Sequence, residues 1–229
     1  MKKDVLAFGA HPDDVELAVG GILIRIVAAG HSVVIVDLTR GELATGGNAE
    51  IRFKEAKEAA KIMGVEREVL DMGDCRLVDS LENRLILVEK IRYYRPKLVL
   101  APYYQDPFGG QGHPDHRAAG TLATHAVRLA QFKKFLPEQR PHQVSGLLFY
   151  GLPRDIQPTF VIDITPYYQR WLKAVMAYRS QFRNPEKPFD YKWFIETLAR
   201  SYGTMAQTKY AQGLFCGEPV RVRDMVEIF

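Results

Sequence analysis

The sequence predicts an α/β fold: a Rossmann-like, three-layer α/β/α arrangement around a mostly parallel sheet, built as one domain over residues 1–229. Three observations predict it. Short aliphatic runs alternate with helical patterns in the first half of the chain, glycines stand where those helices should end, and 47% of the residues are hydrophobic, which suffices for one sizeable core. Such alternation is typical of parallel strands joined by right-handed helical crossovers.

Four buried strands are expected in the first half of the chain. Each run is rich in aliphatic residues and lacks polar alternation, which is typical of strands covered by helices on both faces. The runs are Asp4–Ala10, Ser32–Thr39, Glu68–Gly73 and Lys97–Tyr103.

Three helices are expected between these strands, because apolar residues recur there at spacings of three and four. They cover Asp14–Ala29, Glu50–Met63 and Leu81–Tyr94. Gly30 and Gly64 stand where the C-terminal caps of the first two helices belong.

The pattern changes after Arg117. One helix is expected from there to about Lys134, followed by a connection marked by prolines. Two more strands and two helical segments are expected at Ser145–Gly151, Thr159–Thr165, near 166–182 and near 191–206. The tail from Tyr210 is expected to be a loop with a short terminal element.

The charge distribution argues against a nucleic-acid partner. The 31 basic residues exceed the 27 acidic ones, which gives a net charge of +4. The two signs are interleaved along the helical patterns, however, and no basic block is present, so the charges are typical of solvated helix faces.

We also expect no membrane partner and a cytoplasmic location. No segment has about 18 uninterrupted apolar residues, and the first apolar run is too short for a signal peptide. Cys75 and Cys216 are far apart without C-x-x-C spacing, which favours free thiols in a reducing compartment.

Two loops carry a His-Pro-Asp motif. The sequence "AHPDD" (Ala10–Asp14) follows the first expected strand, and "GHPDH" (Gly112–His116) follows the fourth. In a doubly wound sheet, ligands bind outside the carboxyl ends of the strands, where the strand order reverses. With a strand order of 3-2-1-4, strands 1 and 4 are neighbours, and a site is expected at their carboxyl ends.

Each loop has a structural explanation when it is taken alone. Asp13 or Asp14 can cap a helix, Pro12 is common near a helix start, and Asp115 can cap the next helix. Capping does not explain three histidines, His11, His113 and His116, in loops that meet where this fold binds ligands.

These residue types suit a divalent transition metal. Catalytic zinc sites usually have three protein ligands and one position open to water, and His11, Asp14 and His116 match that count. Two imidazoles favour Zn²⁺ over Mg²⁺, so we expect one Zn²⁺ per chain, with other divalent ions such as Fe²⁺ left open.

Three charged residues of the motifs are then left for catalysis. Asp13 is the candidate general base, because a carboxylate beside an activated water can accept its proton. His113 is a candidate to stabilise the oxyanion or to protonate the leaving amine. Asp115 can hold the His113 ring by its other nitrogen, although a helix cap is an equal alternative.

The two motifs on this framework resemble the PIG-L or LmbE-like family of zinc-dependent N-acetylglucosaminyl deacetylases. Within the family, the chain is most similar to the branch that deacetylates N-acetylglucosaminyl-malate in bacillithiol biosynthesis. Further segments with familiar counterparts include "DLTRGEL", "EIRFKEAKEAAKIMGV", "PKLVLAPYYQD", "YRSQF" and "YAQGLF". The resemblance implies the same metal ligands, with Asp13 as base and His113 paired with Asp115 at the oxyanion.

The resemblance also implies substrate-binding residues. Arg52 matches an arginine that reaches the substrate, and Tyr191 matches a tyrosine that helps to bind the oxyanion. The residues alone favour another interpretation for Arg52, a solvated helix position that makes i,i+4 pairs. Asp74 is a candidate to bind a sugar hydroxyl or, equally, a turn residue.

The expected activity is therefore zinc-dependent removal of the N-acetyl group from a 2-acetamido sugar, either N-acetylglucosaminyl-malate or a related conjugate or oligosaccharide. Two alternatives stay open: a metal-dependent amidase for another conjugate, such as a mycothiol conjugate, and a non-catalytic module that binds nucleotides or nucleic acid. The resemblance implies a homo-oligomer, with a hexamer as one form. The long loop Tyr104–Gly112 borders the expected site and bears on substrate preference.

Overall fold

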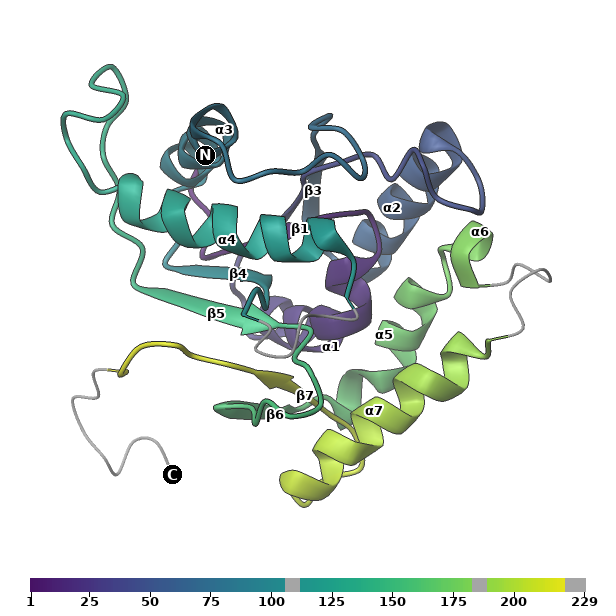
Figure 1. Ribbon diagram of the computed structural model, residues 1–229. Coiled ribbons are helices and arrows are strands. Elements are labelled where there is room, and N and C mark those ends of the chain that lie inside the picture. The colour runs from purple at the N-terminus through teal and green to yellow at the C-terminus, as the bar shows by residue number, and fades with distance from the viewer. Residues whose placement is uncertain (106–111, 183–188, 221–229) are drawn as a thin grey trace.

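The computed structural model describes residues 1–105, 112–182 and 189–220. It confirms the three-layer α/β/α arrangement, in which helices cover both faces of a parallel sheet (Figure 1). The sheet has five strands in the order β3-β2-β1-β4-β5. These strands are β1 (Val5–Gly9), β2 (Val33–Asp37), β3 (Glu66–Val69), β4 (Leu98–Pro102) and β5 (Gly146–Tyr150). Because β1 pairs with both β2 and β4, the strand order reverses between β1 and β4, as predicted.

Each face of the sheet has its own hydrophobic core. Successive side chains of a strand point to opposite faces, so Val5 and Ala7 lie in one core, whereas Leu6 and Phe8 lie in the other. The first core is closed by α1 (Asp14–Ala28) and α5 (Tyr168–Val175), and the second by α3 (Leu81–Tyr94) and α4 (Pro114–Leu129). The helix α2 (Ala49–Met63) packs beside α1 and α5.

Several element boundaries differ from the prediction. The strand expected at Glu68–Gly73 is β3 at Glu66–Val69, although Leu70 and Met72 still donate backbone hydrogen bonds to β2 and to the residue that follows it. The helix expected after Arg117 begins earlier, at Pro114, and ends at Leu129.

The second half of the chain departs further from the prediction. The helical segment expected near 166–182 is broken into the 3₁₀ turn η1 (Thr165–Tyr167), α5 and α6 (Arg179–Phe182), whereas α7 (Tyr191–Met205) lies where it was expected. The strand β6 (Phe160–Asp163) pairs antiparallel with β7 (Ala211–Leu214) in a separate sheet. The prediction of a loop over the start of the tail was therefore wrong.

Long-range contacts explain why β7 forms from a sequence without a β-branched run. The Gln212 side chain accepts a hydrogen bond from the backbone N–H of Ile22 at 3.0 Å, and Leu214 is buried in the first core. In the part of the chain that the structure describes, no helix has the length and apolar character needed to cross a membrane.

Candidate active site

The first motif forms a tight turn between β1 and α1. A Cβ atom at Gly9 would lie 3.0 Å from Asp37 Oδ1 and 3.2 Å from the His11 carbonyl oxygen, so a larger residue would crowd the start of the turn. Asp13 has a φ of 118° and makes no side-chain capping hydrogen bond. Such a conformation costs free energy in a non-glycine residue and is typical of functional sites.

Three of the predicted residues bring donor atoms together. His11 Nδ1 lies 3.5 Å from Asp14 Oδ2, and His116 Nε2 lies 3.0 Å from Asp14 Oδ1. Donor atoms of all three residues lie within 4.8 Å of one another. Tetrahedral zinc, with bonds of about 2.0–2.1 Å, places its ligand atoms about 3.3 Å apart, so this donor set fits one such ion.

The other ring nitrogen of His11 faces two further carboxylates. His11 Nε2 lies 3.1 Å from Asp74 Oδ1 and 3.2 Å from Asp115 Oδ2. Burial acts to lower the pKa of His11, but its hydrogen bond to Asp14 and the charges of Asp14, Asp74 and Asp13 outweigh burial and raise that pKa to about 9. The site therefore favours a positive charge at this position.

Asp13 is a buried carboxylate with one cationic partner. Its Oδ2 atom lies 3.1 Å from Arg52 Nη2. Burial raises the pKa of Asp13 to about 7; Arg52 acts to lower it and Asp14 to raise it. A pKa near neutrality is what general-base catalysis requires.

Arg52 is only 4% exposed, so the interpretation as a solvated helix residue was wrong. Besides its ion pair with Asp13, it donates hydrogen bonds to the carbonyl oxygens of Pro12 and, at 3.4 Å, Gly41. Gly41 has a φ of 63°, and a Cβ atom there would overlap the Arg52 guanidinium. Arg52 thus fixes the turn that carries Asp13.

His113 caps α4, a role that the sequence had suggested for Asp115. Its Nδ1 atom accepts the Asp115 backbone N–H at 3.2 Å. A neutral ring in this arrangement carries its proton on Nε2 and remains a hydrogen-bond donor. Burial and the charge of His11 lower the pKa of His113, which favours the neutral ring.

The Asp115 carboxylate lies elsewhere than expected. Its Oδ2 atom accepts the Cys75 backbone N–H at 2.7 Å and contacts His11, whereas its link to His113 runs through the backbone N–H. The Cys75 thiol lies 3.7 Å from His113 Nε2 at the exposed rim.

Sequence reasoning missed the contact between Asp74 and His11. The signal was available, because Asp74 follows β3 at the same carboxyl edge of the sheet that carries both motifs. Tyr191, by contrast, packs against Phe182 and Phe189, with ring centroids 4.9 and 5.0 Å away, and none of its described contacts involves a site residue. Most of the loop Tyr104–Gly112 lies outside the described residues.

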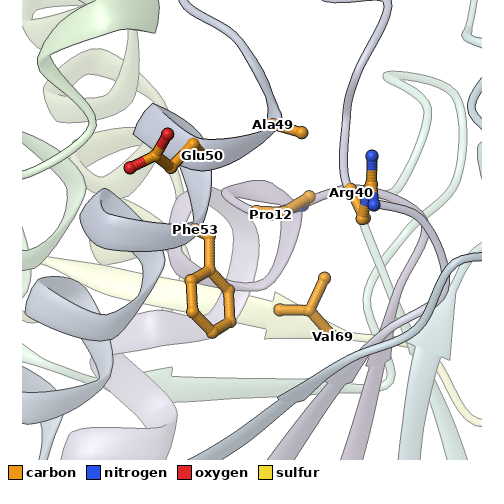
Figure 2. A pocket seen from close by; sticks show the side chains of 6 residues that line it. All are labelled: Pro12, Arg40, Ala49, Glu50, Phe53 and Val69. Carbon is orange, nitrogen blue, oxygen red and sulfur yellow. The ribbon is translucent and has the colours of Figure 1, made fainter.

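A pocket of about 350 Å³ lies beside the first motif (Figure 2). Phe53 and Val69 supply an apolar wall, and Pro12 connects the pocket to the motif. Among the described residues that line it, Glu50 supplies the carboxylate and none is a histidine, so this pocket is distinct from the candidate metal centre.

Comparison with known proteins identifies the family. The sequence profile described as "PIG-L: GlcNAc-PI de-N-acetylase" matches residues 6–127, more than half of the chain. The chain belongs to the PIG-L family. Both motifs lie inside the matched range, so the profile covers the three candidate metal ligands, His11, Asp14 and His116.

Relatives of this PIG-L protein match it over nearly its whole length. A diacetylchitobiose deacetylase from Thermococcus kodakarensis is 34% identical over 226 residues, covering 93% of this chain and 82% of the relative. A conserved protein of Thermus thermophilus, of known structure, is 38% identical with a TM-score of 0.87, covering 97% of this chain and 98% of that one.

A second solved structure extends the comparison to an enzyme in complex with an inhibitor. The N,N'-diacetylchitobiose deacetylase from Pyrococcus horikoshii is 29% identical with a TM-score of 0.86, covering 99% of this chain and 89% of that one. The PIG-L protein described here is accordingly an enzyme of the N-deacetylase type, a hydrolase of amide bonds.

Proposed function

We propose that this enzyme hydrolyses the N-acetyl group of an N-acetylglucosamine-containing sugar and releases acetate and the free amine. One zinc ion per chain would be held by His11, Asp14 and His116. The observation that carries the proposal is the convergence of the two His-Pro-Asp loops, which groups these three donors within 4.8 Å of one another. Asp13, a buried carboxylate with a pKa of about 7, lies next to Asp14 in the same turn.

The residues of the site divide the chemistry between them. A bound zinc ion would supply Lewis-acid polarisation of the acetyl carbonyl and lower the pKa of a water molecule. Asp13 takes the proton of the attacking water, held for that task by Arg52. His113 donates a hydrogen bond from its Nε2–H to the carbonyl oxygen as negative charge develops there, and the proton taken up by Asp13 passes to the leaving nitrogen when the C–N bond breaks.

Diacetylchitobiose is the substrate that the comparisons support best. The relative that is 34% identical over 93% of the chain is a diacetylchitobiose deacetylase. N-acetylglucosaminyl-malate stays a prediction, as do the homo-oligomer and the cytoplasmic location. Binding of the substrate by Arg52 or Tyr191 likewise stays a prediction.

A substrate panel tests the activity. The purified enzyme, loaded with zinc, is incubated with diacetylchitobiose, N-acetylglucosaminyl-malate, an inositol-linked N-acetylglucosamine and a mycothiol S-conjugate, and released primary amine is measured. We expect turnover of at least one N-acetyl sugar. Release of amine from the S-conjugate alone would favour the alternative amidase, and no release from any compound would contradict the proposal.

Metal analysis separates an enzyme of this kind from a pure binding module. We expect stoichiometric zinc in the wild-type protein and its loss in both His11→Ala and His116→Ala. His125→Ala is the matched control, because His125 pairs with Asp79 outside the site. Wild-type zinc content in both site variants would rule out the ligand assignment.

A further inference from the structure

Thr39 lies two residues after the end of β2 and is fully buried. Its hydroxyl donates a hydrogen bond to the Ala10 carbonyl oxygen at 2.9 Å and accepts the Gly41 backbone N–H at 3.2 Å. A threonine hydroxyl is both a donor and an acceptor, and this one is bonded in both ways. The proposed chemistry does not use this hydroxyl, yet it joins the start of the first motif to the loop after β2.

On one side, the hydroxyl fixes the peptide group between Ala10 and His11. The carbonyl oxygen of that peptide also accepts the Thr39 backbone N–H at 3.0 Å. The N–H of the same peptide belongs to His11 and donates to Asp14 Oδ2 at 2.8 Å. Because a peptide group is planar, the orientation of its carbonyl sets that of its N–H. The Thr39 hydroxyl therefore helps to place Asp14 through the peptide that leads into His11.

On the other side, the hydroxyl holds the backbone at Gly41. The Gly41 carbonyl oxygen accepts a hydrogen bond from Arg52 Nη1 at 3.4 Å, and Arg52 Nη2 pairs with Asp13 at 3.1 Å. Without the hydroxyl, the Gly41 N–H would lose its acceptor. A buried N–H without a partner is unfavourable, so we expect this part of the loop to shift and to move Arg52 with it.

We propose that Thr39 is a positioning residue of the reaction centre, and that its hydroxyl aligns the metal ligand Asp14 and the base Asp13 relative to each other. This inference rests on the proposed function, which supplies those two roles. A general base must lie within hydrogen-bond reach of the proton that it removes, and a misplacement of about 1 Å can lower a rate about 10²-fold. One hydroxyl bonded to both loops therefore bears on turnover.

The test compares Thr39→Val with Thr39→Ser. Valine has nearly the shape of threonine but lacks the hydroxyl, whereas serine keeps the hydroxyl and loses the methyl group. The substrate is the N-acetyl sugar that the wild-type enzyme hydrolyses best. We expect Thr39→Val to lower kcat about tenfold or more, with KM near the wild-type value, and Thr39→Ser to keep kcat within about twofold of the wild type.

Zinc affinity gives a second measurement that needs no substrate. It is read by competition with a chromogenic chelator. We expect it to fall about tenfold in Thr39→Val, because Asp14 loses part of its support, and to stay near the wild-type value in Thr39→Ser.

Tyr150→Phe is the matched control. The Tyr150 hydroxyl is also buried and donates to a carbonyl oxygen of β1, that of Phe8, at 2.6 Å. It bonds neither the first motif nor the loop after β2, so its loss should lower Tm while kcat and zinc affinity stay unchanged. An equal loss of kcat in Tyr150→Phe and Thr39→Val would overturn the inference, because any buried hydrogen bond to β1 would then have the same effect.

The remaining outcomes separate positioning from a merely structural role. A Thr39→Val protein with a lowered Tm but wild-type kcat and zinc affinity would contradict the inference. So would a Thr39→Ser protein as impaired as Thr39→Val, because the methyl group would then be what matters. If Thr39→Val does not fold, Thr39→Ala replaces it with the same expectations. Absence of turnover in the wild-type enzyme would contradict the proposed function alone, and zinc affinity would still decide the role of Thr39.

Discussion

Two clusters of buried charged side chains lie near the carboxyl ends of β1 and β2, and their charges are paired differently. The inner cluster joins Glu16, Asp37 and Arg67, whose side chains are at most 4% exposed. Arg67 binds Asp37 with both arms of its guanidinium, at 2.6 and 2.8 Å, and also pairs with Glu16. The outer cluster is the candidate site, which includes Asp14, only two residues before Glu16.

The two clusters differ in how completely their buried carboxylates are paired with other groups of the protein. In the inner cluster, the Tyr178 hydroxyl also donates a hydrogen bond to Glu16 at 3.0 Å. Both carboxylates of that cluster therefore have partners within the protein, and we call it the closed cluster. The outer cluster holds four carboxylates, those of Asp13, Asp14, Asp74 and Asp115, and among the described residues Arg52 is the arginine that pairs with them. Where buried charges are paired within the protein, removal of one partner destabilises the fold, and where negative charge is in larger excess, the cluster is prepared to bind a cation.

Asp13→Asn should produce the largest effect on the outer cluster. Asparagine has nearly the same shape and tolerates a positive φ, so we expect a folded protein that keeps its zinc. Turnover should fall about 10²–10⁴-fold, because the general base is lost. The measurements are kcat at a saturating concentration of the sugar and the zinc content of the same sample. A variant with wild-type kcat would remove Asp13 from the mechanism.

Arg67→Met tests the inner cluster. Two buried carboxylates lose their cation, and we expect the free energy of unfolding to fall by about 3–5 kcal/mol, measured by denaturant titration. Arg84→Met is the control: Arg84 forms a similar two-armed pair with Asp79 near the surface, and should cost about 1 kcal/mol or less. Equal losses of unfolding free energy in the two variants would show that burial of the ion pair does not cause the larger loss expected for Arg67→Met.

We also expect the stability of Arg67→Met to depend on pH differently from that of the wild-type protein. Burial raises the pKa of Asp37 to about 6, although Arg67 opposes the rise. Because the folded-state pKa lies above the unfolded one, the associated stability is present at low pH and is lost as the pH rises through about 6. Without Arg67 the pKa rises further. Between about pH 5 and about pH 8, Arg67→Met should therefore lose more stability than the wild-type protein does.

The sequence was sufficient for the strands of the sheet, because aliphatic runs define them. The neighbouring position of the first and fourth strands followed once the usual order of a doubly wound sheet, 3-2-1-4, was assumed, and that order brought the two motifs together. Arg52 could not be placed in this way. Its position on a helix looks solvated until Gly41, eleven residues earlier, makes room for its guanidinium against Pro12.

The partners of His11 escaped prediction for a related reason. Asp74 and Asp115 are 63 and 104 residues away in sequence, and which carboxylate meets which histidine depends on side-chain geometry at the loop ends. The strand β7 likewise depends on tertiary contacts, because its sequence, Ala-Gln-Gly-Leu, has little strand propensity of its own.

Arg52→Lys tests whether the outer cluster needs only the charge of Arg52 or also the shape of its guanidinium. Lysine keeps the charge beside Asp13 but loses the planar fork that also binds the Pro12 and Gly41 carbonyl oxygens. We expect kcat to fall about tenfold, or about 1.4 kcal/mol, with zinc content and KM nearly unchanged. A raised KM with wild-type kcat would instead support the substrate contact that the family resemblance implies.

Tyr178→Phe should give the smallest effect. The ring stays packed and Glu16 keeps Arg67, so the change removes one buried hydrogen bond, and the free energy of unfolding should fall by about 1 kcal/mol. Because Tyr178 belongs to the closed cluster, turnover and zinc affinity should match the wild type. If zinc affinity fell while stability held, the two clusters would be coupled rather than separate, and the contrast between a closed scaffold and an open cation site would have to be abandoned.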